Sequence, residues 1–267
     1  MQPIDQKTIA DFGQQWTNYR DNSGFYGSTE LFEDAFGALL PSAEVKGKRV
    51  ADIGSGSGRI VSMLLTLGAA EVFAVEPSEA FEVLKENTAK DADRVRYVNA
   101  TGDKLPADAQ VDLVVTYGVL HHIYDPAPVV EACFRALKPG GKMIAWLYGW
   151  EGNAAYLTLA LPMRKLTTHL PHRALDAMSR LLNVGMDAYL PVAKRFPVPL
   201  AGYMNNVIAN LTREHRRLVI YDQLCPAYAR FYKKHEARAL LETAGFQDVR
   251  LHHRHGYSWT VMGTKRQ

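Results

Sequence analysis

The sequence predicts an α/β fold built on a doubly wound, mostly parallel sheet, and three observations support this prediction. Short β-branched runs alternate with helical stretches from Arg49 to Lys142. These runs are almost continuously apolar, as expected for strands that helices cover on both faces. The chain has 267 residues, enough to bury a full core. Right-handed crossovers between parallel strands then give the doubly wound arrangement.

The first part of the chain supplies five strands, expected at residues 49–54, 71–76, 95–100, 112–118 and 142–148. Helical stretches separate them near residues 59–67, 79–90 and 127–137. The turn Lys138-Pro139-Gly140-Gly141 is expected to end the last of these helices.

The alternation resumes near the end of the chain. A helix near 236–244, closed by Gly245, precedes strands near 248–254 and 258–265. Gly256 joins these two strands, which predicts an antiparallel hairpin at the edge of a seven-stranded sheet.

Residues 150–234 interrupt the pattern with helical stretches punctuated by prolines. Within residues 153–221, nine Lys/Arg stand against three Asp/Glu, a net charge of +6, whereas the whole chain carries +3. A basic, apolar helical segment suits an anionic substrate or a membrane surface. The alternative is a solvated basic face over a helix–helix core.

We therefore divide the chain into three parts. Residues 1–30 are an N-terminal helical cover, residues 31–149 and 235–267 form the sheet domain, and residues 150–234 are a helical insertion that acts as an acceptor lid.

Composition limits the class of protein. Hydrophobic residues make up 47% and charged residues 22%, which excludes disordered, collagen-like and disulfide-rich chains. Cys133 and Cys225 have no metal-ligand spacing and suit a reducing compartment. The N-terminus lacks a signal-peptide pattern, and no run of 18 apolar residues occurs. We expect a cytoplasmic protein, with peripheral membrane contact as an open alternative.

The glycine-rich segment Gly54-Ser55-Gly56-Ser57-Gly58 carries the most information about function. It follows a strand that ends at Ile53 and leads into a helix that begins near Arg59. Glycines allow a tight turn and a close ligand, and the helix N-terminus offers unpaired N–H groups. We expect a nucleotide-like cofactor here.

Spacing and an adjacent carboxylate indicate which cofactor. A dinucleotide fingerprint would need a third glycine at the position of Arg59. Asp52, just before the loop, would repel a pyrophosphate but can accept hydrogen bonds from an ammonium group. Both features favour a cofactor with an amino-acid end and no phosphates, such as S-adenosylmethionine.

Glu76 ends the second strand, 18 residues beyond Gly58. An acidic side chain there can accept hydrogen bonds from both ribose hydroxyls of an adenosyl group. The alternative is a helix-capping role, because Pro77-Ser78 begins the next helix, although Ser78 can cap that helix alone.

Five motifs in order resemble those of the class I S-adenosylmethionine-dependent methyltransferases: VADIGSGSGRI, AVEPSE, ATGDKLP, DLVVTYGVLHHIYDP and LKPGGKMI. The tail EARALLETAGFQDVRLHHRHGYSWTVMGTK resembles the closing helix and edge hairpin of the same family. The chain looks like a bacterial small-molecule or glycan-type subgroup with a helical insertion. The resemblance implies a Rossmann-like fold and methyl transfer from S-adenosylmethionine, with S-adenosylhomocysteine as product.

The resemblance also implies where the cofactor lies. The methionine end would be surrounded by Asp52, Gly54, Ser55, Gly56 and Gly58. Glu76 would hold the ribose, with Pro77 beside it, and Thr101, Gly102 and Asp103 would lie along the adenine. Many family members have an Asp at the position of Thr101, so Asp103 or backbone atoms would replace it. Tyr117, Gly118 and Val119 would line the bottom of the cleft.

The N-terminal segment offers a further cofactor contact. Phe12, Trp16 and Tyr19 share one helix face, and FGxxWxxY resembles a leader that covers the cofactor in one family subgroup. Tyr19 or Arg20 would then reach the methionine carboxylate. Alternatively, the aromatic side chains only dock the helix on the core and Arg20 is solvated.

Methyl transfer requires a positioned acceptor and, for oxygen or nitrogen, a base. The candidate bases are His121, His122, Asp222 and His235. His121 and His122 follow the fourth strand, and a pKa of about 6.5 suits base work near neutrality. Their side chains point to different faces, so we expect one to be structural and prefer His122 as the base. Catalysis by positioning alone stays open.

The segment 221–236 resembles a D-x-x-x-P-x-Y element of bacterial methyltransferases for glycan or polyketide-like modification. Aromatic faces suit a sugar or aromatic acceptor, and the candidate acceptor-binding residues are Tyr221, Tyr228, Tyr232, Tyr257 and Trp259. These rings could instead form the core of the insertion or cover the sheet.

We expect no metal, because His253 and His255 share a strand face that His252 opposes and no cysteine is near. TYGVLHH stands where methylation of flipped bases would use an N/D-P-P-Y-type element, so no nucleic-acid partner is expected. We expect a small-molecule acceptor, first an oxygen of a sugar or secondary metabolite. The alternatives are a lipid-linked or hydrophobic acceptor at a membrane surface, or a non-catalytic partner subunit. The sequence carries no signal for an oligomeric state.

Overall fold

The computed structural model describes residues 2–266, which contain one seven-stranded sheet in the order β3-β2-β1-β4-β5-β7-β6. The strands are β1 (Arg49–Ile53), β2 (Glu71–Val75), β3 (Val95–Val98), β4 (Val111–Tyr117), β5 (Leu137–Tyr148), β6 (Gln247–Arg254) and β7 (Ser258–Thr264). The first five run parallel, and β7 runs antiparallel to both β5 and β6. The predicted mostly parallel sheet with an antiparallel edge hairpin is therefore confirmed.

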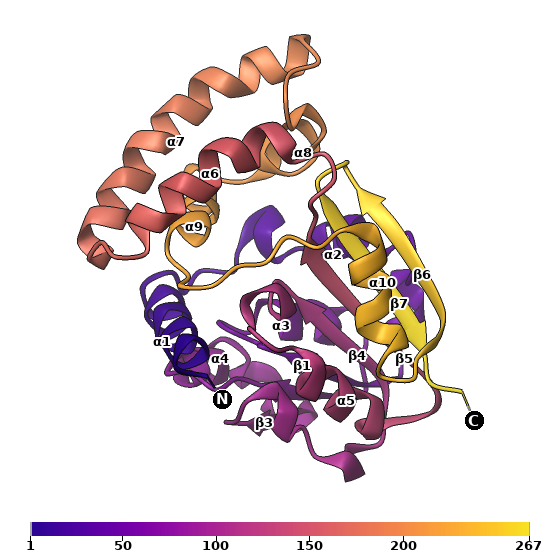
Figure 1. The fold of residues 1–267 in the computed structure, drawn as a ribbon. Helices are drawn as coiled ribbons and strands as arrows, with labels where there is room; N and C mark the ends of the chain where they lie inside the picture. Colours follow the sequence, from indigo (N-terminus) through magenta and orange to yellow (C-terminus); the bar gives the residue numbers. More distant parts are fainter. Residues whose placement is uncertain (1, 267) are drawn as a thin grey trace.

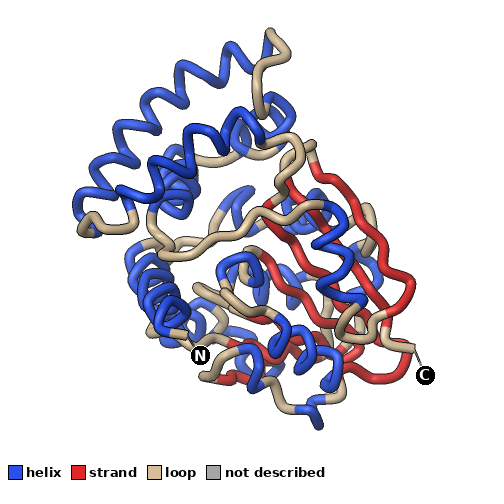
Figure 2. Tube along the Cα trace, in the orientation of Figure 1, coloured by secondary structure: helices blue, strands red, loops and turns tan. Residues whose placement is uncertain are grey.

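Helices cover both faces of the sheet, as Figure 2 shows. One face packs against α2 (Thr29–Phe36), α3 (Arg59–Thr66) and α4 (Ala80–Asn87). The other face packs against α5 (Ala127–Ala136) and α10 (Lys234–Glu242). Strand β4 illustrates the division, because Leu113 and Val115 belong to the first core and Val114 to the second. This double burial explains the continuous apolar runs in the sequence.

Further helices gather at one side of the molecule (Figure 1). They are α1 (Pro3–Asn18) and, between β5 and α10, α6 (Ala154–Thr167), α7 (His172–Arg195), α8 (Ala201–Asn206) and α9 (Arg213–Leu224). We call α6 to α9 the helical cap. Its buried side chains, among them Leu175, Leu218 and Tyr221, form a separate core with Tyr19 and Tyr26. Within residues 2–266, no helix is both long and apolar enough to cross a bilayer.

Short 3-10 turns complete the chain. They are η1 (Gly24–Gly27), η2 (Ser42–Val45), η3 (Ala89–Arg94), η4 (Gly102–Lys104), η5 (Ala107–Ala109), η6 (Leu120–His122) and η7 (Ile208–Asn210).

The expected turn at Lys138–Gly141 is part of β5 instead. Gly140 has a φ of +79° and its N–H donates to the Lys265 carbonyl at 2.7 Å. The Lys265 N–H in turn donates to the Gly141 carbonyl at 2.9 Å. Pairing with the end of the chain thus extends the strand back to Leu137.

Candidate active site

A cavity of about 860 Å³ lies where the carboxyl ends of the parallel strands face α1 and the helical cap. Its floor is formed by residues at or just after strand ends, among them Ile53, Glu76, Tyr117 and Tyr148. In doubly wound sheets, ligands bind at this edge of the strands.

Gly54 of the glycine loop lines the cavity, whereas the predicted cofactor residues Asp52, Ser55, Gly56 and Gly58 are outside its lining. The N–H groups of Gly54 and Ser55 donate to the Val75 carbonyl at 2.8 and 3.0 Å, which ties the loop to β2. Gly54, Gly56 and Gly58 all have positive φ, between 52° and 84°. A Cβ on Gly54 would lie 2.5 Å from Val119 Cγ2, and one on Gly56 would lie 2.9 Å from the Trp16 indole nitrogen. Only glycine fits these two positions.

Glu76 is buried at the cavity wall. Its carboxylate accepts hydrogen bonds from the Gly56 N–H at 2.8 Å, and from the Ser78 N–H and hydroxyl at 2.9 and 2.5 Å. The Ser78 hydroxyl oxygen also accepts from the Ala80 N–H, so Ser78 serves the start of the helix. Glu76 is thereby fixed between the glycine loop and the cavity.

Asp52 is the most unusual ionisable group near the loop. Its side chain is 1% exposed, and within residues 2–266 neither carboxylate oxygen has a hydrogen-bond partner. Burial raises the pKa of this carboxyl to about 7. A buried carboxylate without a donor fits a ligand that brings a positive charge.

These features fit S-adenosylmethionine. The loop leaves no room for side chains at Gly54 and Gly56, Asp52 offers an unpaired carboxylate, and Glu76 offers a second one at the wall. Pro77, Thr101, Gly102 and Asp103 also line the cavity, and Asp103 pairs with Lys104 at 3.1 Å.

The N-terminal helix covers the loop with two of its three expected aromatic residues. Phe12 and Trp16 line the cavity. Tyr19 does not: its hydroxyl donates to Asp176 and accepts from Arg217, both at 3.0 Å, within the cap. Arg20 pairs instead with Glu86 at the surface. The structure therefore does not bring Tyr19 or Arg20 to the cofactor side of the cavity.

Arg59 lines the cavity. From the sequence, this position indicated only that the third glycine of a dinucleotide fingerprint is absent. Its guanidinium lies 4.3 Å from the ring centroid of Tyr26 and 4.6 Å from that of Tyr117. Tyr117 stacks on Trp146 at 4.7 Å. The position of Arg59 directly after the glycine loop could have indicated that it lines the cavity, because side chains at the start of this helix lie beside the strand ends.

His121 and His122 have different surroundings. His121 is fully buried, stacks on Tyr148 at 3.8 Å, and its Nδ1 accepts from the Tyr148 N–H at 3.4 Å. His122 lines the cavity, and its Nδ1 lies 2.7 Å from the Tyr228 carbonyl. Because a carbonyl only accepts, the proton of His122 is assigned to Nδ1. Burial lowers the pKa of His122 to about 4 and that of His121 well below its usual value.

Asp222 lines the cavity as the centre of a polar chain. Its carboxylate accepts from Gln15 at 3.0 Å and from the Tyr148 hydroxyl at 2.8 Å. Gln223 donates to that same hydroxyl at 2.6 Å and accepts from Tyr156 at 2.8 Å. Tyr148, Tyr156 and Gln223 also line the cavity, and sequence reasoning missed all three. Residues 148 and 222 are 74 positions apart, so no local pattern connects them.

The remaining candidates are dispersed. Tyr257 lines the cavity, whereas Tyr228 contributes only its carbonyl to His122. Tyr221 contacts His172, Tyr232 is buried under Arg230, and Trp259 donates to Glu151 at 2.9 Å. His235 is exposed at the start of α10. The structure places Tyr221, Tyr232, Trp259 and His235 outside the cavity lining.

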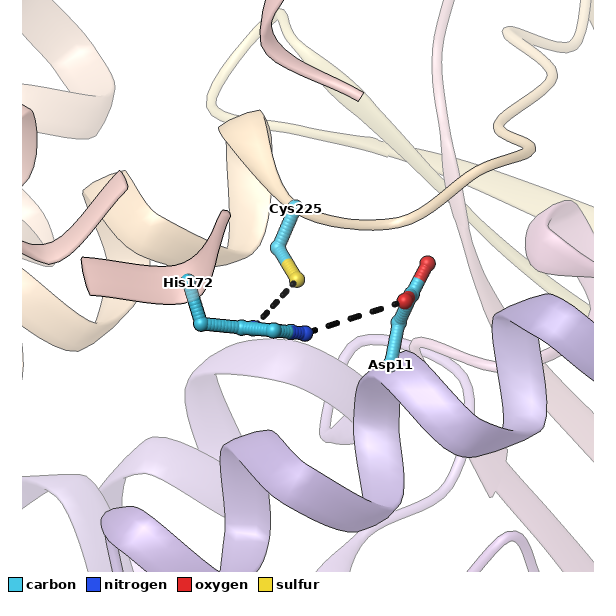
Figure 3. Close-up of side chains that lie close together, drawn as sticks. All are labelled: Asp11, His172 and Cys225. Carbon is cyan, nitrogen blue, oxygen red and sulfur yellow. Dashed lines mark hydrogen bonds and ion pairs between the residues drawn. The ribbon is translucent and has the colours of Figure 1, made fainter. Parts of the chain in front are cut away.

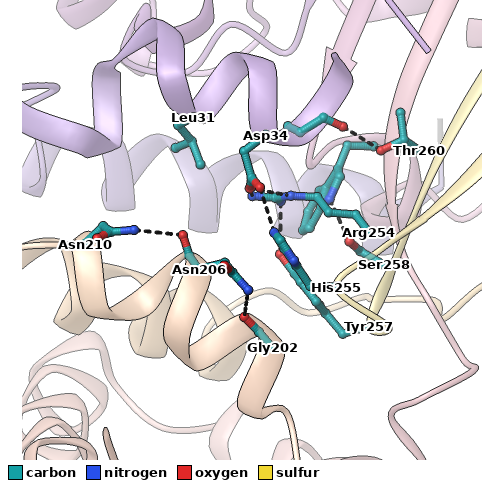
Figure 4. Close-up of polar contacts among 12 residues, drawn as sticks. Leu31, Asp34, Gly202, Asn206, Asn210, Arg254, His255, Tyr257, Ser258 and Thr260 are labelled. Atoms are coloured by element: carbon teal, nitrogen blue, oxygen red, sulfur yellow. Dashed lines mark hydrogen bonds and ion pairs between the residues drawn. The ribbon is translucent and has the colours of Figure 1, made fainter. Parts of the chain in front are cut away.

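Arg254 of β6 and Asp34 of α2 form an ion pair near Tyr257 (Figure 4). Arg254 is 1% exposed and pairs with Asp34, which also contacts His255 Nε2 at 2.7 Å. The guanidinium donates to the hydroxyls of Tyr257 and Tyr117 at 3.0 and 3.4 Å. Arg254 therefore positions two side chains of the cavity floor.

A second cluster lies apart from the cavity lining and joins three elements (Figure 3). Asp11 of α1 faces His172 of α7 at 4.0 Å, and Cys225 after α9 lies 3.8 Å from His172 Nδ1. Lys7 donates to both oxygens of Asp11 at 3.1 and 2.9 Å. Because Lys7 already compensates the charge, we describe the cluster as a contact between α1 and the cap.

Comparisons with known proteins identify the family of this chain. A methyltransferase domain model matches residues 51–145. The ubiquinone biosynthesis O-methyltransferase of Aromatoleum aromaticum is 33% identical over 172 residues, covering 60% of this chain and 72% of that protein. The corresponding protein of Paraburkholderia phymatum is 32% identical over 142 residues, covering 52% of this chain and 60% of that one. The chain spans 44 to 62% of the length of three such relatives.

Among solved structures, the 1,6-didemethyltoxoflavin-N1-methyltransferase of Burkholderia thailandensis, with bound S-adenosylhomocysteine, shares the fold at 16% identity and a TM-score of 0.51. The match covers 96% of this chain and 86% of that one. The chain belongs to the class I S-adenosylmethionine-dependent methyltransferases, and S-adenosylmethionine is its cofactor.

Proposed function

We propose that this chain transfers a methyl group to an oxygen of a hydrophobic small molecule. The observation that carries the proposal is the lining of the cavity beyond the strand ends. Most of the side chains that the cap contributes there are apolar, for example Met163, Met186, Met204, Ile208, Leu211 and Leu218. A free sugar would leave hydroxyls unpaired against such a wall. The lining therefore favours a hydrophobic acceptor over the sugar expected first.

The cavity has room for two ligands. Small-molecule sites commonly measure about 300–1,000 Å³, and this cavity of about 860 Å³ lies near the upper end of that range. Its cofactor side carries Asp103, Glu76 and Gly54, whereas its cap side carries the apolar wall. We infer that the cofactor occupies the first side and the acceptor the second.

His122 is the base of this proposal. With its proton on Nδ1, the Nε2 atom keeps a free lone pair, and its low pKa keeps the ring neutral at physiological pH. S-adenosylmethionine supplies an electrophilic methyl group on a sulfonium. His122 Nε2 takes the acceptor's hydroxyl proton as the oxygen bonds to the methyl carbon, and the electron pair of the broken S–C bond returns to sulfur.

Tyr148, Asp222, Gln223 and Tyr156 orient the polar end of the acceptor. Burial and the Asp222 carboxylate raise the pKa of Tyr148 well above its usual value, so this hydroxyl keeps its proton and donates to Asp222. The chain of hydrogen bonds fixes these groups beside the apolar wall. The names of the curated relatives, O-methyltransferases of ubiquinone biosynthesis, support oxygen as the methylated atom.

Mass spectrometry tests the proposal. The protein is incubated with S-adenosylmethionine bearing a deuterated methyl group and a panel of hydrophobic phenols, hydrophobic amines and free sugars. The proposal expects labelled methyl ethers from the phenols. Labelled sugars with unlabelled phenols, or products labelled at nitrogen only, would contradict it.

A further inference from the structure

The outward face of α7 is apolar. Ala177, Leu181, Val184, Ala188 and Val192 follow a helical spacing of four, three, four and four residues, so they form one stripe. Leu181 is 73% exposed and Val184 is 59% exposed. Leu166, in the last turn of α6, and Leu170, between α6 and α7, are also exposed. We call this stripe with the two leucines the outer apolar face.

Basic side chains surround the outer apolar face. Lys165, Arg173, Lys194 and Arg195 are exposed, and within residues 2–266 none of them makes an ion pair. The acidic side chains of α7 are already paired: Asp176 with Arg180 and Arg217, and Asp187 with Arg213 and Arg216. The free charge around the face is therefore positive.

The side of α7 next to the outer apolar face borders the cavity. Leu182, Gly185, Met186 and Tyr189 line it, yet Leu182 and Gly185 are exposed to the outside as well. Because these two residues are both exposed and part of the lining, we infer that the cavity opens here, beside the outer apolar face. A different set of exposed lining residues, Lys104, Asp125 and Pro128, marks an opening on the cofactor side.

We propose that the outer apolar face docks on an anionic lipid surface and that the acceptor enters the cavity from the bilayer past the side of α7 that carries Leu182 and Gly185. An exposed apolar stripe flanked by cations is the arrangement of helices that lie in the membrane interface. A second copy of the chain fits less well, because a symmetric contact would bring the cations of both copies together.

The part of this proposal that concerns the acceptor rests on the proposed function, whereas the docking on lipid does not. A hydrophobic acceptor partitions into lipid, so an opening that faces the bilayer shortens its path through water. The cofactor is water-soluble and uses the other opening. The two openings explain how one cavity serves two ligands of opposite solubility.

Vesicle flotation of the full chain tests the docking without any acceptor. Vesicles of neutral phosphatidylcholine are compared with vesicles that contain phosphatidylglycerol, at low and at high salt. We expect the protein to float with the anionic vesicles and to be released in part by salt, because salt screens the attraction between basic side chains and anionic headgroups.

Two variants and two matched controls locate the contact. Leu181→Asp should weaken vesicle binding about tenfold or more, whereas Trp150→Asp, at an exposed ring away from α7, should not. Arg173→Glu should weaken binding about fivefold or more, whereas Lys90→Glu, the same charge change on η3, should have little effect. These sites are exposed, so circular dichroism should show unchanged folds.

Wild-type protein that stays with the soluble fraction would overturn the proposal. Equal losses in the α7 variants and their controls would overturn it too. A dimer in sedimentation velocity that Leu181→Asp dissociates would assign the face to a second copy instead. Docking without methylation of any hydrophobic compound would leave the docking standing and contradict the proposed function alone.

Discussion

The imidazole of His122 is held in one tautomer, because the partner of its Nδ1 is a carbonyl. Its ring also meets Phe12 edge-on at 4.8 Å and Tyr148 at 5.5 Å. The ring is therefore fixed from three sides, with Nε2 the nitrogen that can take a proton. His121, one residue earlier, uses its ring for packing against Tyr148.

His122→Asn tests the role of His122 as a base. The amide can still donate to the Tyr228 carbonyl but has no basic nitrogen, so kcat should fall by about 10²–10⁴. The affinity for S-adenosylmethionine, measured by calorimetry, should stay unchanged. His235→Ala is the matched control and should keep full activity, since His235 is exposed outside the cavity. A variant that loses cofactor binding instead would assign His122 to packing.

The pH dependence of kcat/KM provides a second test of the same residue. Burial lowers the pKa of His122 to about 4, so the ring is neutral from pH 6 upward and becomes protonated only as the pH falls towards 4. The rate should be flat near neutrality and decline below about pH 5. A decline centred near pH 6.5 would point to a base with an ordinary histidine pKa.

We expect Asp52 to make the affinity for the cofactor depend on pH. Burial raises the pKa of Asp52 to about 7, so below pH 7 the cofactor-free protein keeps a proton there. An ammonium group favours the ionised form, so binding must release that proton, and affinity should weaken up to about tenfold per pH unit below 7. Titration calorimetry between pH 5.5 and 7.5 measures this slope. Asp52→Asn should bind more weakly and without the slope; an unchanged slope would remove Asp52 from the methionine end.

Glu76 is expected to hold the ribose. Glu76→Ala should weaken S-adenosylmethionine binding by about 1–3 kcal/mol, because ribose hydroxyls and the Gly56 N–H lose their acceptor. Glu79→Ala, at an exposed neighbouring carboxylate, is the control and should bind normally. Equal affinities of wild type and Glu76→Ala by calorimetry would refute the ribose role.

Among the structural elements, the features that depend on neighbouring residues were predicted most accurately from the sequence. The glycine loop, the strand ends that carry Asp52 and Glu76, and the edge hairpin through Gly256 depend on backbone geometry and apolar periodicity within a few residues. β5 was predicted too short, because its first residues are held by the distant Lys265.

The cap shows what local rules do not decide. Tyr221, Tyr232 and Trp259 were predicted to bind the acceptor, but their side chains make other contacts. Which face of a helix borders a cavity depends on how the cap helices pack together, and proline-punctuated helical stretches do not encode that packing. Tyr148 and Asp222 meet only after β5 and α9 are both in place.

The ion pair between β6 and α2 is important for the stability of the sheet edge. Asp34→Ala would leave the guanidinium of Arg254, 1% exposed, without its carboxylate. We expect a loss of about 3–5 kcal/mol in the free energy of unfolding, measured by denaturant titration. Glu242→Ala, which breaks an exposed pair with Arg238, should cost about 0–1 kcal/mol. Similar losses in both variants would mean that the tyrosine hydroxyls alone satisfy Arg254.

Across the whole molecule, the strand ends and the helical cap line different parts of the cavity. Gly54, Glu76 and His122 follow strands of the sheet, whereas α6 to α9 add an apolar wall. In the function that we propose, the first part holds the cofactor and the second the acceptor.

The most direct test of a hydrophobic acceptor compares kcat/KM for one phenol carrying alkyl chains of increasing length. Each buried methylene contributes about 0.8 kcal/mol, so kcat/KM should rise about three- to fourfold per added carbon until the apolar wall is filled. A rise followed by a plateau would support the account. Values independent of chain length, or falling from the shortest chain onward, would contradict it.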